Sequence, residues 1–351
     1  MILLLSFDVR RKGGIERLTL QVKKSLETSG NSVKLLTPKR MGKSWWGRQL
    51  GRFYFVLSLL PALLLSEKVL SMHVLLLKPV KWLQWCRSPN QTLHCWVHGI
   101  EVWGNNLTLH QNTLRGCRSL IASSSFTKNQ LTALNTEIKV VHPIADLFDP
   151  STKPQSLPGS LKLLTVARMS RQEKYKGHEL IINALHELNQ QGELPQSLRW
   201  DVVGDGDQLQ ELTKRVQELG LEHRVCFHGS ISDNELRTAF QNCSILLMPS
   251  NFKIDSLGNA SGEGFGIVYL EAALAGRASI GCNEGGQTDL IQDGETGWLI
   301  PPSTTSLINV LRIIINQPAL ASTFGAKARD YALKEFSVER FNQQLIKALE
   351  L

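Results

Sequence analysis

Residues 263–271, EGFGIVYLE, combine two carboxylates with a glycine-rich turn, and these groups could bind a phosphorylated sugar. On one continuous helix, Glu263 and Glu271 would lie roughly 12 Å apart along the axis. We instead expect Glu263 in a loop, a tight turn at 264–266, and a helix that begins near Ile267. The start of such a helix attracts anions such as phosphate. Glu271 would then accept hydrogen bonds from hydroxyls beside that phosphate, which is the chemistry of a nucleotide sugar.

A basic segment follows the predicted strand 162–166 and reads ARMSRQEKYKGH over residues 167–178. Transfer of a sugar from a nucleoside diphosphate requires the departing diphosphate to be stabilised. Without a metal ion, fixed cations and amides must meet that charge. An arginine can hold phosphate through two hydrogen bonds, and a lysine supplies a point charge. The alternative is that this segment is a solvated basic loop that binds no phosphate.

The full string EGFGIVYLEA resembles the E-x7-E signature of retaining glycosyltransferases of family 4, which share the GT-B fold. The resemblance covers nearly the whole chain and is strongest from residue 162 to residue 302. It implies that Arg168 and Lys176 hold the donor phosphates and stabilise the leaving group. Lys174 and Arg171 compete with Lys176 by position, and the Lys-Gly junction favours Lys176.

The same resemblance assigns the residues around the turn. It implies that Glu263 holds hydroxyls of the donor sugar and that Glu271 binds the ribose. Backbone amides of three residues would face the phosphate or the sugar, namely Gly264, Phe265 and Gly266. Residues 228–231, HGSI, resemble the segment that flanks the nucleotide base, where contacts are usually made by backbone.

Two further candidates lie in the N-terminal half. Residues 96–104, WVHGIEVWG, resemble the family's HGxE-type segment, so His98 is expected near the donor sugar or the acceptor hydroxyl. Gly14, in a Gly-Gly pair after the first predicted strand, would let the backbone approach the donor phosphates or the acceptor. A structural histidine and a plain tight turn are the alternatives. His94 and His98 have the spacing of a metal pair, but no third ligand stands out, so no metal site is predicted.

Strands and helices alternate along the chain, which predicts an α/β fold with parallel sheets. The alternation runs through the first half, breaks at a proline-rich segment between residues 143 and 159, and then restarts. The resemblance implies the GT-B architecture of two Rossmann-like domains facing each other across a cleft. We expect an acceptor-binding domain at 1–155, a nucleotide-sugar-binding domain at 156–334, and a C-terminal helix at 335–351 that returns to the first domain.

Charge is distributed unevenly over the 351 residues. Residues 1–150 carry 20 Lys and Arg against 8 Asp and Glu, whereas residues 151–351 carry 19 against 23. A basic first half suggests an acidic partner such as an anionic membrane. Peripheral attachment is favoured by basic residues around Trp45, Trp46 and Phe53, namely Arg40, Lys43, Arg48 and Arg52. A solvated basic surface is the alternative, and no nucleic-acid-binding motif is present. The six cysteines form no C-x-x-C pair and are typical of reduced, mostly buried thiols in a cytoplasmic protein.

We therefore expect a retaining, metal-independent glycosyltransferase that moves a hexose from a UDP- or GDP-sugar to an acceptor hydroxyl, without a cofactor. A lipid-linked or envelope-glycan acceptor fits the family, and the protein is expected in the cytoplasm or at the inner face of the membrane. Two alternatives stay open: a GT-B sugar-nucleotide epimerase, and a non-catalytic protein that binds sugar nucleotides at a membrane. The residues do not identify the sugar, the base or the acceptor.

Overall fold

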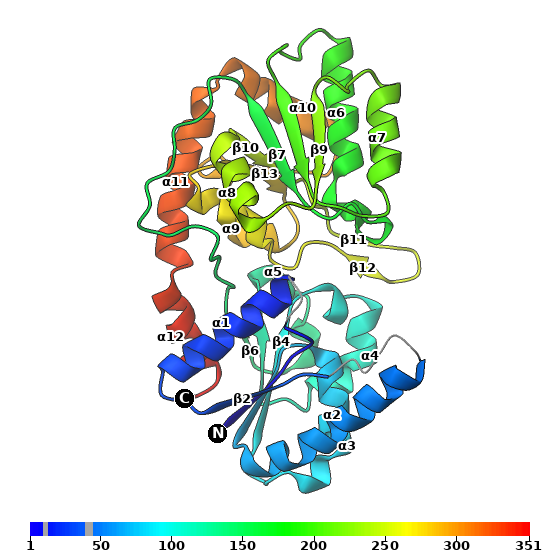
Figure 1. Cartoon of the computed structure of the whole chain (residues 1–351), viewed down its shortest axis with the longest axis vertical. Coiled ribbons are helices and arrows are strands. Elements are labelled where there is room, and N and C mark those ends of the chain that lie inside the picture. Colours follow the sequence, from blue (N-terminus) through cyan, green and yellow to red (C-terminus); the bar gives the residue numbers. More distant parts are fainter. Residues whose placement is uncertain (10–12, 39–44) are drawn as a thin grey trace. The chain divides into compact units, whose positions relative to one another are not determined.

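The structure is a computed structural model that describes residues 1–9, 13–38 and 45–351. The chain forms two compact units, one of residues 1–144 with 338–351 and one of residues 145–337 (Figure 1). Each unit contains a six-stranded parallel sheet, and a two-stranded antiparallel ribbon belongs to the second unit. The first unit ends before the predicted boundary at 155, and the C-terminal helix belongs to it.

The first unit orders its strands β2-β1-β3-β4-β5-β6. The strands are β1 (Ile2–Leu5), β2 (Val33–Leu36), β3 (Lys68–Ser71), β4 (Thr92–Val97), β5 (Ser119–Ala122) and β6 (Ile138–Val140). The helices are α1 (Gly14–Thr28), α2 (Trp45–Leu65), α3 (Leu77–Trp82), α4 (Asn105–Leu114), α5 (Ser125–Asn129) and α12 (Val338–Ala348), with 3₁₀ turns η1 (Val74–Leu76), η2 (Gln84–Cys86), η3 (Ile100–Val102) and η4 (Thr132–Leu134). All four residues of β1 are buried, as expected of an apolar strand covered on both faces of a parallel sheet.

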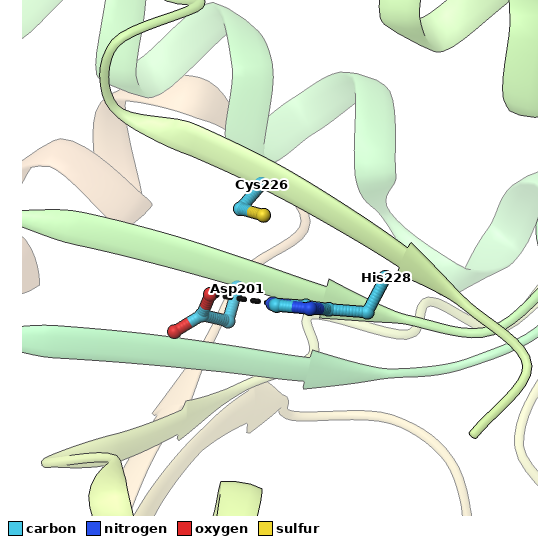
Figure 2. A group of neighbouring side chains, drawn as sticks. All are labelled: Asp201, Cys226 and His228. Carbon is cyan, nitrogen blue, oxygen red and sulfur yellow. Dashed lines mark hydrogen bonds and ion pairs between the residues drawn. The ribbon is translucent and has the colours of Figure 1, made fainter.

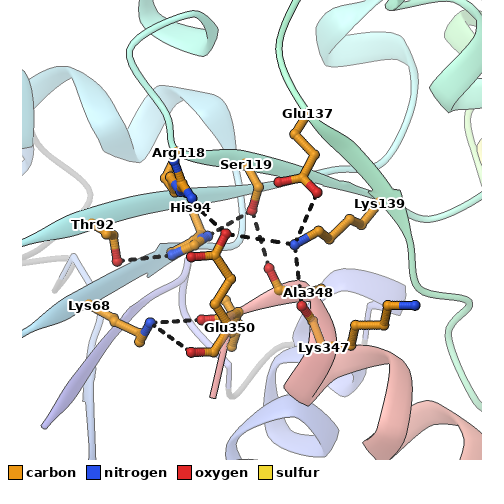
Figure 3. A network of polar contacts seen from close by, with 11 residues as sticks. Lys68, Thr92, His94, Arg118, Ser119, Glu137, Lys139, Lys347, Ala348 and Glu350 are labelled. Carbon is orange, nitrogen blue, oxygen red and sulfur yellow. Dashed lines mark hydrogen bonds and ion pairs between the residues drawn. The ribbon is translucent and has the colours of Figure 1, made fainter.

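Helix α12 packs on the first sheet beside α1. Its Phe341 and Leu345 share a core with Leu18 and Val22, which recur at helical spacing along α1. Polar contacts hold the end of α12, where Lys68 donates to the carbonyls of Leu349 and Glu350 at 2.9 and 3.2 Å (Figure 3). The last residues of the chain are therefore part of the first unit's structure.

The second unit orders its strands β14-β13-β10-β7-β8-β9. The strands are β7 (Lys162–Val166), β8 (Arg199–Val203), β9 (Val225–Gly229), β10 (Ile245–Leu247), β13 (Ala278–Cys282) and β14 (Gly297–Ile300), and the ribbon is β11 (Lys253–Ile254) with β12 (Ala260–Ser261). The helices are α6 (His178–Gln190), α7 (Leu209–Glu218), α8 (Asp233–Asn242), α9 (Ile267–Leu274), α10 (Thr304–Asn316) and α11 (Ala319–Glu335), with 3₁₀ turns η5 (Arg171–Lys176) and η6 (Gly286–Asp289).

Two apolar clusters cover the faces of this second sheet. Residues of α6 and α10 pack with Trp200 and Val202 on one face, whereas residues of α8 and α9 pack with Leu164 and Leu246 on the other. The sheet is thus buried on both sides, and its strands end in loops that carry several of the motifs described above. The carboxyl ends of parallel strands are where ligands bind in such folds.

All six cysteines are unpaired; five are buried and Cys226 is exposed. Among the residues that the structure describes, no individual helix combines the length and apolarity needed to cross a bilayer. Helices α10 and α11 reach that length and composition only as a pair, and they meet at 104°.

Candidate active site

The basic segment after β7 folds into η5 and holds two of the predicted phosphate-binding residues in different environments. The Arg168 side chain is 77% exposed, and its Nη2 lies 2.5 Å from the Glu173 carboxylate, which is 16% exposed. A mostly buried carboxylate thus orients a guanidinium that faces solvent. Lys174, the competing candidate, pairs instead with Glu179 at 3.1 Å on the surface. Arg168 therefore has the exposure that contact with a ligand requires.

Lys176, by contrast, is held inside the unit by Glu263. Its Nζ lies 2.5 Å from Glu263 Oε2, and the two side chains are only 14% and 13% exposed. The same Nζ lies 5.2 Å from the centre of the Tyr175 ring, within range of a cation–π contact. Burial alone would lower the pKa of Lys176, but the charge of Glu263, helped by Tyr175, raises it above its ordinary value. Lys176 is therefore a fixed cation at neutral pH.

The turn after Glu263 has the predicted form, since the helix α9 begins at Ile267. Gly266 caps α9 with a φ of +88°, a left-handed conformation that favours glycine. The loop of Gly286 lies against this turn, where its N–H donates to the Glu263 carbonyl at 2.7 Å. A Cβ on Gly286 would lie 2.2 Å from the Gly264 carbonyl oxygen, so only glycine allows this approach.

Phe265 and Glu271 are both buried. The Phe265 ring packs 6.1 Å from the ring of Phe336, so its side chain anchors the turn in the core. Any contact of Phe265 with a donor would therefore come from its backbone, as predicted. Glu271 lies in α9, and its binding of ribose hydroxyls stays a prediction because its side chain presents little surface.

His98 lies in the first unit, directly after β4, and both of its ring nitrogens already have partners. Nε2 lies 2.8 Å from the Met72 carbonyl oxygen, and Nδ1 lies 3.1 Å from Ser123 Oγ. Because a carbonyl only accepts, Nε2 carries a proton and donates it to Met72, and Nδ1 shares a hydrogen bond with the Ser123 hydroxyl, which accepts from Trp96 Nε1 at 2.8 Å. The geometry describes an imidazole that two hydrogen bonds hold in one orientation. Its contact with a substrate stays a prediction and would require one of these hydrogen bonds to break.

The backbone around His98 is tied by one carboxylate. Glu101 accepts from the N–H of His98 at 2.5 Å and from the N–H of Gly99 at 3.0 Å. Gly14 is the first residue of α1, and a Cβ there would meet nothing within 4 Å, which leaves its role untested. His98 and Gly14 both belong to the first unit, whereas the other predicted site residues lie in the second.

Gln287, which was not predicted, joins the loop after β10 to the end of β13 and the turn that follows it. Its buried amide donates to the carbonyls of Ser250, Cys282 and Glu284 at 2.9, 2.9 and 2.7 Å. The sequence analysis also missed Tyr269, whose hydroxyl donates to the Met248 carbonyl. Both side chains also bind carbonyls of a distant segment, Ser250 for Gln287 and Met248 for Tyr269, and those contacts have no local sequence signal.

Solved structures share this fold. Anabaena HepE in complex with UDP and glucose superposes with a TM-score of 0.75 at 21% identity, over 99% of each chain. The sucrose-phosphate synthase of Thermosynechococcus elongatus gives 0.77 at 19% identity, over 99% of this chain and 97% of that one. The two-domain α/β fold is thus the GT-B fold that the resemblance implied.

Sequence comparison then identifies the family. Residues 152–331 match the family of glycosyl transferases group 1. The alpha-1,3/1,6-mannosyltransferase ALG2 of Dictyostelium discoideum is 32% identical over 139 residues, which are 40% of this chain and 31% of that protein. A GDP-mannose-dependent alpha-(1-6)-phosphatidylinositol monomannoside mannosyltransferase of Mycolicibacterium smegmatis is 29% identical over 48% of this chain and 43% of its own length. The chain spans less than half the length of these curated relatives. Because the family match covers half of the chain, this protein belongs to glycosyl transferases group 1.

Proposed function

We propose that the protein transfers a hexose, with retention and without a metal ion, from a UDP- or GDP-sugar to an acceptor hydroxyl. The observation that carries the proposal is the Lys176–Glu263 ion pair beside the turn that opens α9. It brings a fixed cation, a carboxylate and a helix start into one place. The cation and the helix start could bind the diphosphate of a nucleotide sugar, and the carboxylate could bind hydroxyls of its sugar.

The donor diphosphate would be met by two cations of different exposure. Arg168, which faces solvent, would bind the phosphates as they enter, and Lys176 would stabilise the charge that develops on the leaving oxygen. The start of α9 adds a partial positive charge, since the first N–H groups of a helix lack intrahelical partners. Donor hydroxyls would donate hydrogen bonds to the Glu263 carboxylate, which would loosen its hold on Lys176 as the phosphate arrives.

Retention follows in this proposal from front-face displacement. The bond between the anomeric carbon and the leaving phosphate oxygen breaks, the acceptor oxygen attacks from the same face, and the leaving phosphate takes the acceptor proton. In this proposal the two cations and the start of α9 stabilise the leaving diphosphate, as a divalent ion does in other transferases. The proposed reaction therefore needs no cofactor. The uracil or guanine base would be held mainly by backbone, which is why both nucleotides remain in the proposal.

The names of relatives guide the choice of acceptor. The Mycolicibacterium relative acts on a phosphatidylinositol mannoside, and a Rhizobium relative, 29% identical over 192 residues, is named for lipopolysaccharide core biosynthesis. A lipid-linked or envelope-glycan acceptor is therefore proposed here too, with the enzyme at the inner face of a membrane.

Helix α2 supports attachment to an anionic membrane surface. One face of α2 is buried through Phe55, Leu59 and Leu63. The other face exposes apolar side chains at helical spacing, at Trp46, Leu50, Phe53, Leu57, Leu64 and Leu65. An apolar face of this length needs a partner to cover it.

Tryptophans from neighbouring elements extend this face. Trp82, which ends α3, and Trp85, in η2, are 72% and 76% exposed, and η2 contacts α2. Tryptophan favours the membrane interface, and the basic balance of residues 1–150 suits anionic lipid. Of the basic residues predicted to help, Arg40 and Lys43 lie outside the described residues.

The donor half of the proposal is tested by incubating the protein with a panel of UDP- and GDP-hexoses and measuring thermal stabilisation and release of nucleoside diphosphate. One nucleotide sugar at 100 times its dissociation constant should stabilise the fold by about 2.7 kcal/mol. Product that retains the anomeric configuration supports transfer. Conversion of the donor to its epimer without acceptor would favour an epimerase, and no stabilisation by any of these donors would refute the proposal.

The membrane half is tested separately by co-sedimentation with vesicles of graded phosphatidylglycerol content. Binding should rise with anionic lipid, weaken with salt, and fall when Trp82 and Trp85 are both replaced by Ser. The control Leu257→Ser removes an equally exposed apolar residue from the second unit and should leave binding unchanged. Equal binding to neutral vesicles would refute the role of anionic lipid, whereas no binding at low salt would favour a soluble acceptor.

A further inference from the structure

Three side chains with different metal-binding chemistry converge on the edge of the second sheet. Asp201 lies on β8 directly opposite Cys226 on the edge strand β9, and His228 follows two residues later. On β9, Val225 points into the core while Cys226 and His228 are exposed, as strand alternation requires. All three side chains therefore lie on the same side of two neighbouring strands.

A β-bulge adjusts the position of His228. The register between β8 and β9 shifts after Val202, so that Val203 pairs with Gly229 and His228 becomes the extra residue. A bulge of this kind re-aims a side chain relative to the regular ladder. Here it brings His228 Nε2 to 2.7 Å from Asp201 Oδ1 (Figure 2).

The distances suit one shared ion. A sulfur, an imidazole nitrogen and a carboxylate oxygen from these residues all lie within 4.8 Å of one another. The ring of His228 and the Cys226 sulfur lie on the same side of the strands in Figure 2. His228 and Asp201 are 40% and 35% exposed, so an ion can reach them from solvent. No other group of three such residues occurs in the part of the chain that the structure describes.

We propose that Asp201, Cys226 and His228 form a binding site for Zn²⁺ or a similar borderline-soft divalent cation. Thiolate and imidazole ligands select such ions over Mg²⁺ and Ca²⁺, which prefer oxygen. Three protein ligands leave the fourth tetrahedral position to water. The alternative is an ordinary Asp201–His228 ion pair beside an unrelated exposed thiol, which would bind no metal tightly.

The surroundings provide room for that fourth ligand. A cavity of about 320 Å³ adjoins the site, lined by Asp201 and His228 and by Glu235 and Thr238 of α8. On binding, the ion displaces the thiol proton of Cys226 to solvent, since a coordinating thiol is deprotonated.

Occupation would join the edge strand to its neighbour. Strand β9 pairs on one side only, and the ion would link it to β8 through side chains as well as backbone. The site shares no residue with Arg168, Lys176 or Glu263, and His228 enters the proposed donor site only through the backbone of the segment 228–231 that would flank the base. Zinc binding and metal-independent sugar transfer can therefore be tested separately, and failure of one leaves the other standing.

The test titrates the metal-free protein with Zn²⁺ by calorimetry and with Co²⁺ by absorption spectroscopy. We expect one ion per chain and a cobalt–thiolate charge-transfer band. Binding should weaken about tenfold or more in Cys226→Ser and in His228→Asn. The matched control His223→Asn changes an exposed histidine just before β9 and should bind as the native protein does.

A second measurement does not depend on any variant. Cys226 is the exposed cysteine among the six, so a thiol reagent should modify the native protein fastest at this position. Bound Zn²⁺ should slow that modification, and a chelator should restore it. Native-like metal binding by Cys226→Ser, no binding by the native protein, or a modification rate unaffected by Zn²⁺ would each overturn the proposal.

Discussion

The Lys176–Glu263 pair makes the sharpest prediction, because the same two side chains hold the structure and serve the proposed chemistry. Replacing Lys176 by Ala leaves the Glu263 carboxylate mostly buried without its cation. Breaking a buried ion pair in this way costs about 3–5 kcal/mol of unfolding free energy. Because the two side chains keep 14% and 13% of their surface, we expect the lower end of that range. The same change removes a preorganised charge at the leaving group, which costs about 2.7–4 kcal/mol of transition-state stabilisation, or about 100- to 1,000-fold in turnover.

A paired variant separates these two effects. Lys176→Met together with Glu263→Gln replaces the ion pair by neutral groups of similar size, and such replacements are often neutral for stability. Urea denaturation should therefore show a midpoint near that of the native protein for the double variant, and a lower midpoint for Lys176→Ala. Turnover should be low in both proteins.

The assay measures nucleoside diphosphate released from the donor sugar identified by thermal stabilisation, under saturating donor. Lys174→Ala is the control, since this lysine forms a surface pair of the same kind a few residues away. Native turnover in Lys176→Ala, or recovery of turnover in the double variant, would refute the role of Lys176 at the leaving group. An unchanged denaturation midpoint in Lys176→Ala would refute the structural part of the reasoning.

Three further predictions are independent of that pair. Transfer activity should survive an excess of chelator, because cations of the chain face the diphosphate; loss on chelation that magnesium or manganese restores would overturn metal independence. Burial, opposed in part by Glu350, lowers the pKa of His94 from 6.5 to about 4, so the unfolded chain takes up a proton that the native state does not. The contribution of neutral His94 to the free energy of unfolding is therefore complete above pH 6.5 and falls by about 3 kcal/mol toward pH 4. Denaturation curves should show a weaker pH dependence in His94→Asn than in the native protein, and identical pH profiles would contradict this. Gly286→Ala should lower the denaturation midpoint by the equivalent of about 1–3 kcal/mol, because its Cβ would press on the Gly264 carbonyl; a native midpoint would show that the loop adapts.

Local chemistry made the elements of this fold predictable. The alternation of apolar strands and helices predicted parallel sheets, and the second sheet begins at Lys162–Val166 as expected. The Gly-Phe-Gly turn predicted a loop at Glu263 and a helix start at Ile267, which the structure confirms. These features depend on backbone preferences and side-chain spacing within a few residues, so the sequence contains them directly. The C-terminal helix, expected at 335–351, spans Val338–Ala348 and is three residues shorter at each end.

Tertiary structure alone decided which side chains meet. Lys176 and Glu263 are 87 residues apart, and they meet because η5 and the turn before α9 pack together within the second unit. His98 was predicted from its motif, but the Met72 carbonyl and Ser123 that occupy its ring nitrogens come from other segments.

The metal-ligating group at β8 and β9 illustrates the same limit. Asp201 lies 27 residues from His228, and no spacing rule connects them. Strand order places β8 beside β9, the register sets Asp201 against Cys226, and a single bulge re-aims His228. Residue types and local spacing determine what a side chain can do, whereas the packing of distant segments determines which partner it has, because that choice depends on contacts that no short stretch of chain contains.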